Sequence, residues 1–76
     1  MPLEELKALL RYKNISYREL ANELNRSTST ICLKINRKAG YEFTSSEIIK
    51  AAEFLELDHR DVVRYFLPEL VAPYAS

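Results

Sequence analysis

The sequence has very few of the residues that build disulfides, metal sites and flexible linkers. Its 76 residues include one cysteine, one histidine, one glycine and no tryptophan. Cys32 by itself cannot form an internal disulfide, and Cys32 with His59 supplies too few ligands for a zinc site. We therefore expect no metal and no other cofactor, and we expect the chain to work in a reducing, cytoplasmic environment.

Long apolar runs and a net charge are missing as well. The chain contains no run of eighteen apolar residues, which a membrane-spanning helix would need, and its start lacks the basic residues of a signal peptide. We therefore expect a protein that is neither exported nor placed in a membrane. Without a glycine-rich phosphate loop or a close pair of catalytic side chains, we expect neither an enzyme nor a small-molecule substrate.

The residues that are present are those of a folded globular domain, with 47% apolar and 29% charged side chains. The length predicts one domain, residues 1–76. A chain this short buries only about 60% of the surface that its unfolded form exposes, so an interface with a second copy would add to its stability.

Apolar residues recur at helical spacing in five segments, and strand-like alternation is not sustained anywhere. The expected helices cover residues 2–12, 17–25, 28–36, 45–56 and 59–67. Each helix after the first follows a residue suited to cap it, namely Ser16, Ser27, Thr44 and Asp58. Ser16 with Glu19 and Thr44 with Glu47 also have the spacing of a capping box. The sequence thus predicts an all-α fold.

Charge is unevenly distributed along this neutral chain. Residues 11–38 hold seven basic and two acidic side chains, a net charge of +5, and the rest holds four basic and nine acidic ones, a net charge of −5. The basic segment is therefore the part that would attract phosphate groups.

The same segment contains two short capped helices joined by about three residues. This is the geometry of a helix-turn-helix, here residues 16–36, whose second helix is free to enter the major groove of DNA. The small side chain of Ala21 would allow the close approach that the two helices need. Spacing and charge together favour a DNA-binding protein.

The run SYRELANELNRSTSTICLKINRK resembles the helix-turn-helix of the lambda-repressor and Cro group, the Xre family. The resemblance covers about residues 3–67 and rests on Leu20-Ala21 with Leu24, on the start of the next helix at residues 27–31, and on the later helix at residues 48–57. The pattern of Phe43, Glu47-Ile48-Ile49 and Tyr65-Phe66 is similar to small phage repressor-like proteins.

This resemblance implies a five-helix lambda-repressor-like domain that binds double-stranded DNA. It implies a transcriptional regulator, a repressor of phage or prophage type, acting at the bacterial nucleoid. Two residues depart from the family pattern: Asn25 stands where most members have glycine, and Arg26 stands where they have an apolar residue.

By the same resemblance, Thr28, Ser29 and Tyr17 would contact DNA bases, and helical spacing adds Leu33 for contact with a thymine methyl group. Phosphate contacts are expected from a set of polar and basic residues in the turn and at the end of the second helix: Arg26, Ser27, Lys34, Arg37 and Lys38. An alternative for the last three is a solvated helix end, where cations interact favourably with the helix dipole.

The C-terminal segment, residues 68–76, is apolar apart from Glu69. Tyr65, Phe66, Leu70 and Val71 are more than a short last helix can bury, so we expect them to form a homodimer interface. A twofold dimer would place two recognition helices about one DNA turn, roughly 34 Å, apart. The alternative is an antirepressor-like module of the same fold that docks its apolar tail on another protein and binds DNA weakly.

Overall fold

The computed structural model describes residues 2–70, which form five α-helices and two short 3-10 turns and contain no strand. The helices are α1 (Glu4–Tyr12), α2 (Tyr17–Leu24), α3 (Thr28–Asn36), α4 (Ser45–Leu55) and α5 (His59–Phe66), and the 3-10 turns are η1 (Lys38–Gly40) and η2 (Pro68–Leu70). The predicted all-α class is confirmed. None of the helices in this range is long and apolar enough to cross a membrane.

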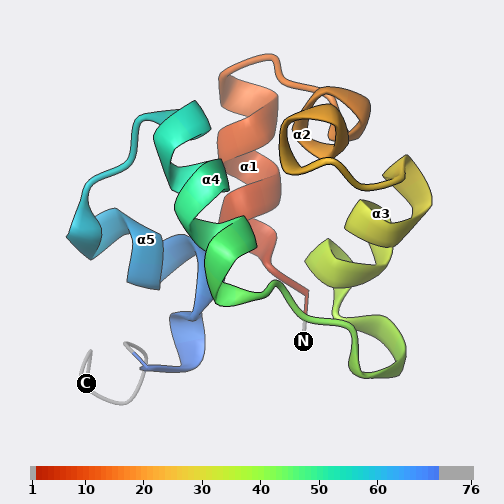
Figure 1. Cartoon of the computed structure of the whole chain (residues 1–76). Coiled ribbons are helices and arrows are strands. Elements are labelled where there is room, and N and C mark those ends of the chain that lie inside the picture. Colours follow the sequence, from red (N-terminus) through yellow and green to blue (C-terminus); the bar gives the residue numbers. More distant parts are fainter. Residues whose placement is uncertain (1, 71–76) are drawn as a thin grey trace.

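Figure 1 shows α3 and α5 at opposite ends of the molecule, with α1 and α4 between them. Helix α2 packs against both α3 and α4, and α5 packs against α1. The segment before α1 is fixed to the C-terminal end of α3, because the Leu3 N–H donates to the Ile35 carbonyl at 2.9 Å.

Helices α2 to α5 begin at the predicted caps, whereas α1 begins at Glu4, two residues after its predicted start, and has no side-chain cap. The Ser16 hydroxyl accepts the Glu19 N–H, while the Glu19 carboxylate accepts the Ser16 N–H, so the first capping box is complete. Helices α3 and α5 begin after Ser27 and Asp58, whose side chains accept N–H groups three residues on. These bonds satisfy donors that a helix start otherwise leaves unpaired.

Helices α1 and α3 end at the predicted residues, and α2, α4 and α5 each end one residue earlier than predicted. Helix α2 ends at Leu24 because Asn25 adopts a left-handed conformation, with φ of 57°, and the Arg26 N–H then donates to the Ala21 carbonyl at 2.9 Å. Glu56 ends α4 with the same left-handed conformation, although its side chain has no special tolerance for it.

One contiguous core holds the five helices together. Its buried side chains are Leu3, Leu6, Leu10, Leu20, Ala21, Leu24, Ile31, Ile35, Ala51, Leu55 and Phe66. Helical spacing predicts an apolar face on α4 made of Ile48, Ile49, Ala52 and Leu55. Ala52 and Leu55 are buried and Ile48 packs against the core, whereas Ile49 is 60% exposed. The predicted face of α4 is therefore confirmed except at Ile49.

The prediction that Phe66 forms part of a dimer interface is wrong. Its side chain is only 2% exposed, and its ring meets the Phe43 ring edge-on with centroids 5.3 Å apart. Phe66 thus stabilises the monomer, and it is not available to a second copy.

Replacement of Ala21 tests the close approach of α2 and α3. Ala21 is 1% exposed, so Ala21→Leu forces extra carbon atoms into a filled crossing and should lower the free energy of unfolding by about 1–3 kcal/mol. The same change at Ala8, which is exposed on α1, should alter it by less than about 0.5 kcal/mol. Urea denaturation of both variants measures the difference, and equal values would contradict the tight crossing.

Candidate functional site

Helix α3 has one buried face and one accessible face. Ile31, Lys34 and Ile35 are buried, and Thr28, Ser29 and Cys32 are exposed. Because successive residues of a helix turn by 100°, Ser29, Leu33 and Asn36 lie on the side opposite the buried residues. The structure therefore places the predicted base-contacting residues Ser29 and Leu33 on one face, with Thr28 at its edge. Ser29 and Thr28 are exposed, and Leu33 and Asn36 are partly exposed.

Asn36 is a member of this face that the sequence analysis missed. Its side-chain amide donates to the Cys32 carbonyl at 2.9 Å and lies 3.5 Å from the Cys32 sulfur. Asn36 is three residues after Leu33 and seven after Ser29, so helical spacing alone would have placed it there.

Two other residues that were expected to contact DNA, Tyr17 and Ser27, make contacts within the protein. Tyr17 is only partly exposed, because its side chain packs against the core at the start of α2. The Ser27 hydroxyl accepts the Thr30 N–H and donates to the Thr30 hydroxyl at 2.9 Å. The Ser27 side chain thus caps α3, a role that competes with the predicted phosphate contact.

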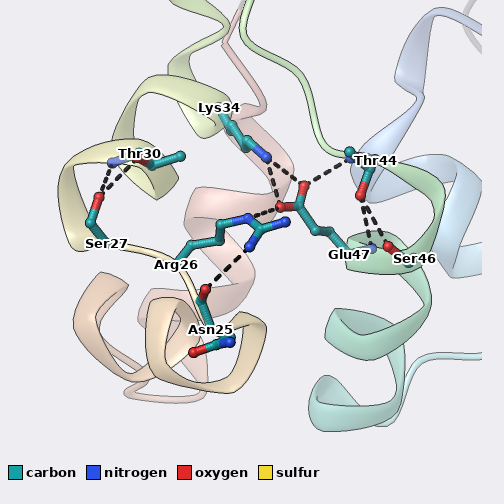
Figure 2. Close-up of polar contacts among 8 residues, drawn as sticks. All are labelled: Asn25, Arg26, Ser27, Thr30, Lys34, Thr44, Ser46 and Glu47. Atoms are coloured by element: carbon teal, nitrogen blue, oxygen red, sulfur yellow. Dashed lines mark hydrogen bonds and ion pairs between the residues drawn. The ribbon is translucent and has the colours of Figure 1, made fainter.

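The predicted phosphate-contacting residues Arg26 and Lys34 bind a carboxylate inside the protein. Figure 2 shows both side chains directed at Glu47, at the start of α4. The Lys34 ammonium donates to both Glu47 oxygens, at 2.6 and 2.7 Å, and Arg26 Nε donates to Oε2 at 2.7 Å. We call these three residues the Glu47 triad.

Glu47 also completes the second predicted capping box. Its Oε1 accepts the Thr44 N–H at 2.9 Å, and the Thr44 hydroxyl accepts the Glu47 N–H at 3.2 Å. The carboxylate is thus bound from three segments of the chain: the α2–α3 turn, α3 and the loop before α4.

The Glu47 carboxylate is ionised and buried, with a side chain that is 3% exposed. Burial by itself raises its pKa, but the hydrogen bonds from Lys34, from the Thr44 N–H and from Arg26 outweigh burial and lower the pKa from 4.5 to about 2. The partners are unequally accessible, since the Lys34 side chain is 10% exposed and that of Arg26 is 47% exposed. The structure therefore contradicts the expectation that Lys34 contacts phosphate at the surface, because its ammonium group is enclosed beside Glu47.

Arg37 has internal partners too. It follows the last residue of α3 in a left-handed conformation, with φ of 53°. Its guanidinium donates to the Phe66 carbonyl at the end of α5, at 2.9 Å, and to the Glu69 carboxylate, at 3.0 Å. The hydrogen bond from Arg37 lowers the pKa of Glu69. Arg37 thus joins the end of α3 to the end of α5.

These pairs reduce the positive charge that the α2–α3 region presents. When Glu47 and Glu69 are counted with residues 11–38, seven basic side chains meet four acidic ones, a net charge of +3. Within residues 11–38, four exposed cations form no ion pair in the described structure: Arg11, Lys13, Arg18 and Lys38. Of the predicted phosphate contacts, only Lys38 is in this group.

The sequence held one signal for the Glu47 triad. Arg26 occupies a position where an apolar side chain was expected, and an inward-facing arginine needs a carboxylate partner. Capping-box spacing identified Glu47, but it could not show that a residue 21 positions from Arg26 lies beside it.

By its fold and surface, the protein is a small five-helix domain in which the third helix, α3, has one face turned away from the core. The chain belongs to the family described as "Protein of unknown function (DUF739)", whose profile matches residues 11–69, from the end of α1 to η2. No curated protein and no solved structure matches it.

The lowered pKa of Glu47 predicts an acid-sensitive fold. The unfolded chain takes up the Glu47 proton near pH 4.5 and the folded chain near pH 2, so the stabilisation is complete above about pH 5 and is lost as the pH falls. At about pH 3, the contribution of Glu47 to the free energy of unfolding should be about 2 kcal/mol smaller than at neutral pH. Urea denaturation across this range should show a steeper pH dependence for the natural chain than for Glu47→Gln, and parallel curves would contradict the assignment.

Proposed function

We propose that the protein binds double-stranded DNA sequence-specifically and regulates transcription as a repressor that occludes a promoter. The observation that carries this proposal is the accessible face of α3, which the three-residue turn at residues 25–27 presents beside α2. The arrangement supports a helix-turn-helix, and α3 would be the recognition helix in the major groove. The resemblance to the lambda-repressor and Cro group agrees with this role.

The chemistry of that face fits base edges. Ser29 and Thr28 carry small hydroxyl groups that donate or accept, and Leu33 offers apolar contact to a thymine methyl group. Asn36 is the one α3 side chain with an amide donor and an amide acceptor, the pair that reads adenine. Since the side chains on the first turn are short, the α3 backbone can approach the groove closely.

Two of the cations that remain exposed, Arg18 and Lys38, would position the protein on the DNA backbone. Arg18 lies on the first turn of α2, and Lys38 follows α3 in η1. If each protomer of a dimer contacts two phosphates, the slope of log K against log salt is about −3.6, and affinity falls roughly 100-fold from 50 to 200 mM salt. This salt dependence is less steep than the slope near −5 that is expected if a dimer neutralises about six phosphates.

We further propose that two copies bind together through the C-terminal apolar surface. Tyr65 is partly exposed and Leu70 is 57% exposed, whereas Val71 lies outside the described residues. Tyr65 lines an apolar hollow with Pro2, Leu3 and Pro68. A twofold axis at this surface would bring each Leu70 to the hollow of the other copy.

Selection of binding sites from a random duplex pool, followed by fluorescence anisotropy, tests DNA binding. Ser29→Ala and Asn36→Ala should each relax the base preference at one position and weaken specific binding by about 1–3 kcal/mol. Arg18→Ala should weaken binding to all sequences and reduce the salt slope by about 1 per protomer.

Arg60→Ala is the matched control, because Arg60 is exposed on α5, at the opposite end of the molecule from α3 (Figure 1). It removes the same charge as Arg18→Ala and should leave the salt slope unchanged. Absence of any selected sequence at low salt would refute the proposed function. That result would favour the alternative of a protein-binding, antirepressor-like module.

Sedimentation equilibrium tests the dimer surface. Leu70→Asp places a charge on that surface and should convert a dimer to a monomer at tens of micromolar protein. Ile49→Asp is the control, since Ile49 is similarly exposed but lies on α4. A natural chain that remains monomeric even on its selected DNA would rule out the dimer.

A further inference from the structure

The two cations of the Glu47 triad belong to the segment that the proposed function places on DNA. Arg26 lies in the turn before α3, and Lys34 lies eight residues later within α3. Both charges nevertheless bind Glu47 of α4 (Figure 2). By the helical repeat, Lys34 lies on the other side of α3 from Ser29. The protein thus carries cations in its recognition segment and directs them inward.

We propose that Glu47 is a specificity-determining residue, which withholds Arg26 and Lys34 from the DNA backbone and thereby suppresses binding to non-specific sequences. This inference rests on the proposed DNA-binding function. It assigns to Glu47 an effect on DNA discrimination in addition to its capping of α4.

The physical basis is the different origin of the two kinds of affinity. Non-specific binding comes almost entirely from contacts between cations and phosphates, whereas base contacts by α3 add only to specific binding. Each cation kept from a phosphate therefore lowers non-specific affinity without removing a base contact. Arg26 is the principal case, because its half-exposed side chain is near enough to solvent to turn outward when its partner is removed.

The triad also fixes where α3 sits. Glu47 binds the turn before α3 through Arg26 and the middle of α3 through Lys34, while the Thr44 N–H holds the carboxylate at the start of α4. Loss of its charge would therefore loosen α3 as well as free the cations. Both effects reduce the ratio of specific to non-specific binding, since base contacts require a fixed helix and phosphate contacts do not.

Glu47→Gln separates the charge from the cap. The amide oxygen can still accept the Thr44 N–H, but it carries no charge to hold Arg26 and Lys34. The matched control is Glu53→Gln, which removes an equal charge from an exposed position of the same helix; Glu53 forms no ion pair within residues 2–70. A third variant, Arg26→Gln, keeps the Lys34–Glu47 pair and changes a half-exposed residue.

The experiment compares binding of a selected duplex and an unrelated duplex by fluorescence anisotropy over a series of salt concentrations. For Glu47→Gln we expect non-specific affinity to rise about tenfold at 50 mM salt for each new phosphate contact, and the salt slope to steepen by about 1 per protomer. The specific-to-non-specific ratio should fall. Glu53→Gln and Arg26→Gln should retain the natural salt slope, because neither changes a cation that contacts a phosphate.

Two results would overturn the inference. If the salt slope of Arg26→Gln is smaller than that of the natural chain by about 1 per protomer, Arg26 already contacts a phosphate in the natural chain. This comparison remains valid even if Glu47→Gln fails to fold. An unchanged slope and ratio in folded Glu47→Gln, confirmed by its circular dichroism, would restrict Glu47 to a structural role. Either result leaves the proposed function intact, whereas failure of the natural chain to bind any duplex refutes that function itself.

Discussion

The carboxylate of Glu47 lies where three segments of the chain meet, and the arrangement of α3 depends on it. Lys34 and Arg26 bind it from α3 and from the preceding turn, and the Thr44 N–H binds it from the start of α4. A buried carboxylate without partners would cost several kcal/mol, so these donors must stay in place while the protein is folded. Because they come from different elements, satisfying one charge fixes the relative positions of α3 and α4.

This constraint explains how a neutral chain of this size presents an accessible α3. The apolar residues Ile31 and Ile35 attach α3 to the core, and Lys34 adds a polar attachment to α4 on an adjacent side of the helix. The opposite side, with Ser29, Leu33 and Asn36, is the face that we propose to contact DNA. Arg37 adds a second polar connection, from the end of α3 to the end of α5, so that the proposed recognition helix is linked to the proposed dimer surface.

The elements that followed from the sequence are those with local causes. Ser16 with Glu19, Ser27, and Thr44 with Glu47 begin helices at the predicted residues, because a cap acts over three positions of the chain. The left-handed Asn25 ends α2 for an equally local reason. The exposure of Ile49 on α4 and the burial of Phe66 beside Phe43 could not be read from the sequence, since helical spacing does not say which neighbour a face will meet.

The sequence by itself determined the five helices, the caps of the last four and the short turn before α3, because these depend on interactions within a few residues. It also placed Ser29 and Leu33 on one side of α3 through the helical repeat. Only the tertiary structure decided what the basic residues do. Arg26 and Lys34 bind Glu47, and Arg37 binds the end of α5, because charges far apart in sequence become neighbours only when the helices pack. The buried carboxylate of Glu47 requires such donors, and the long-range contacts that bury it are not encoded in local spacing.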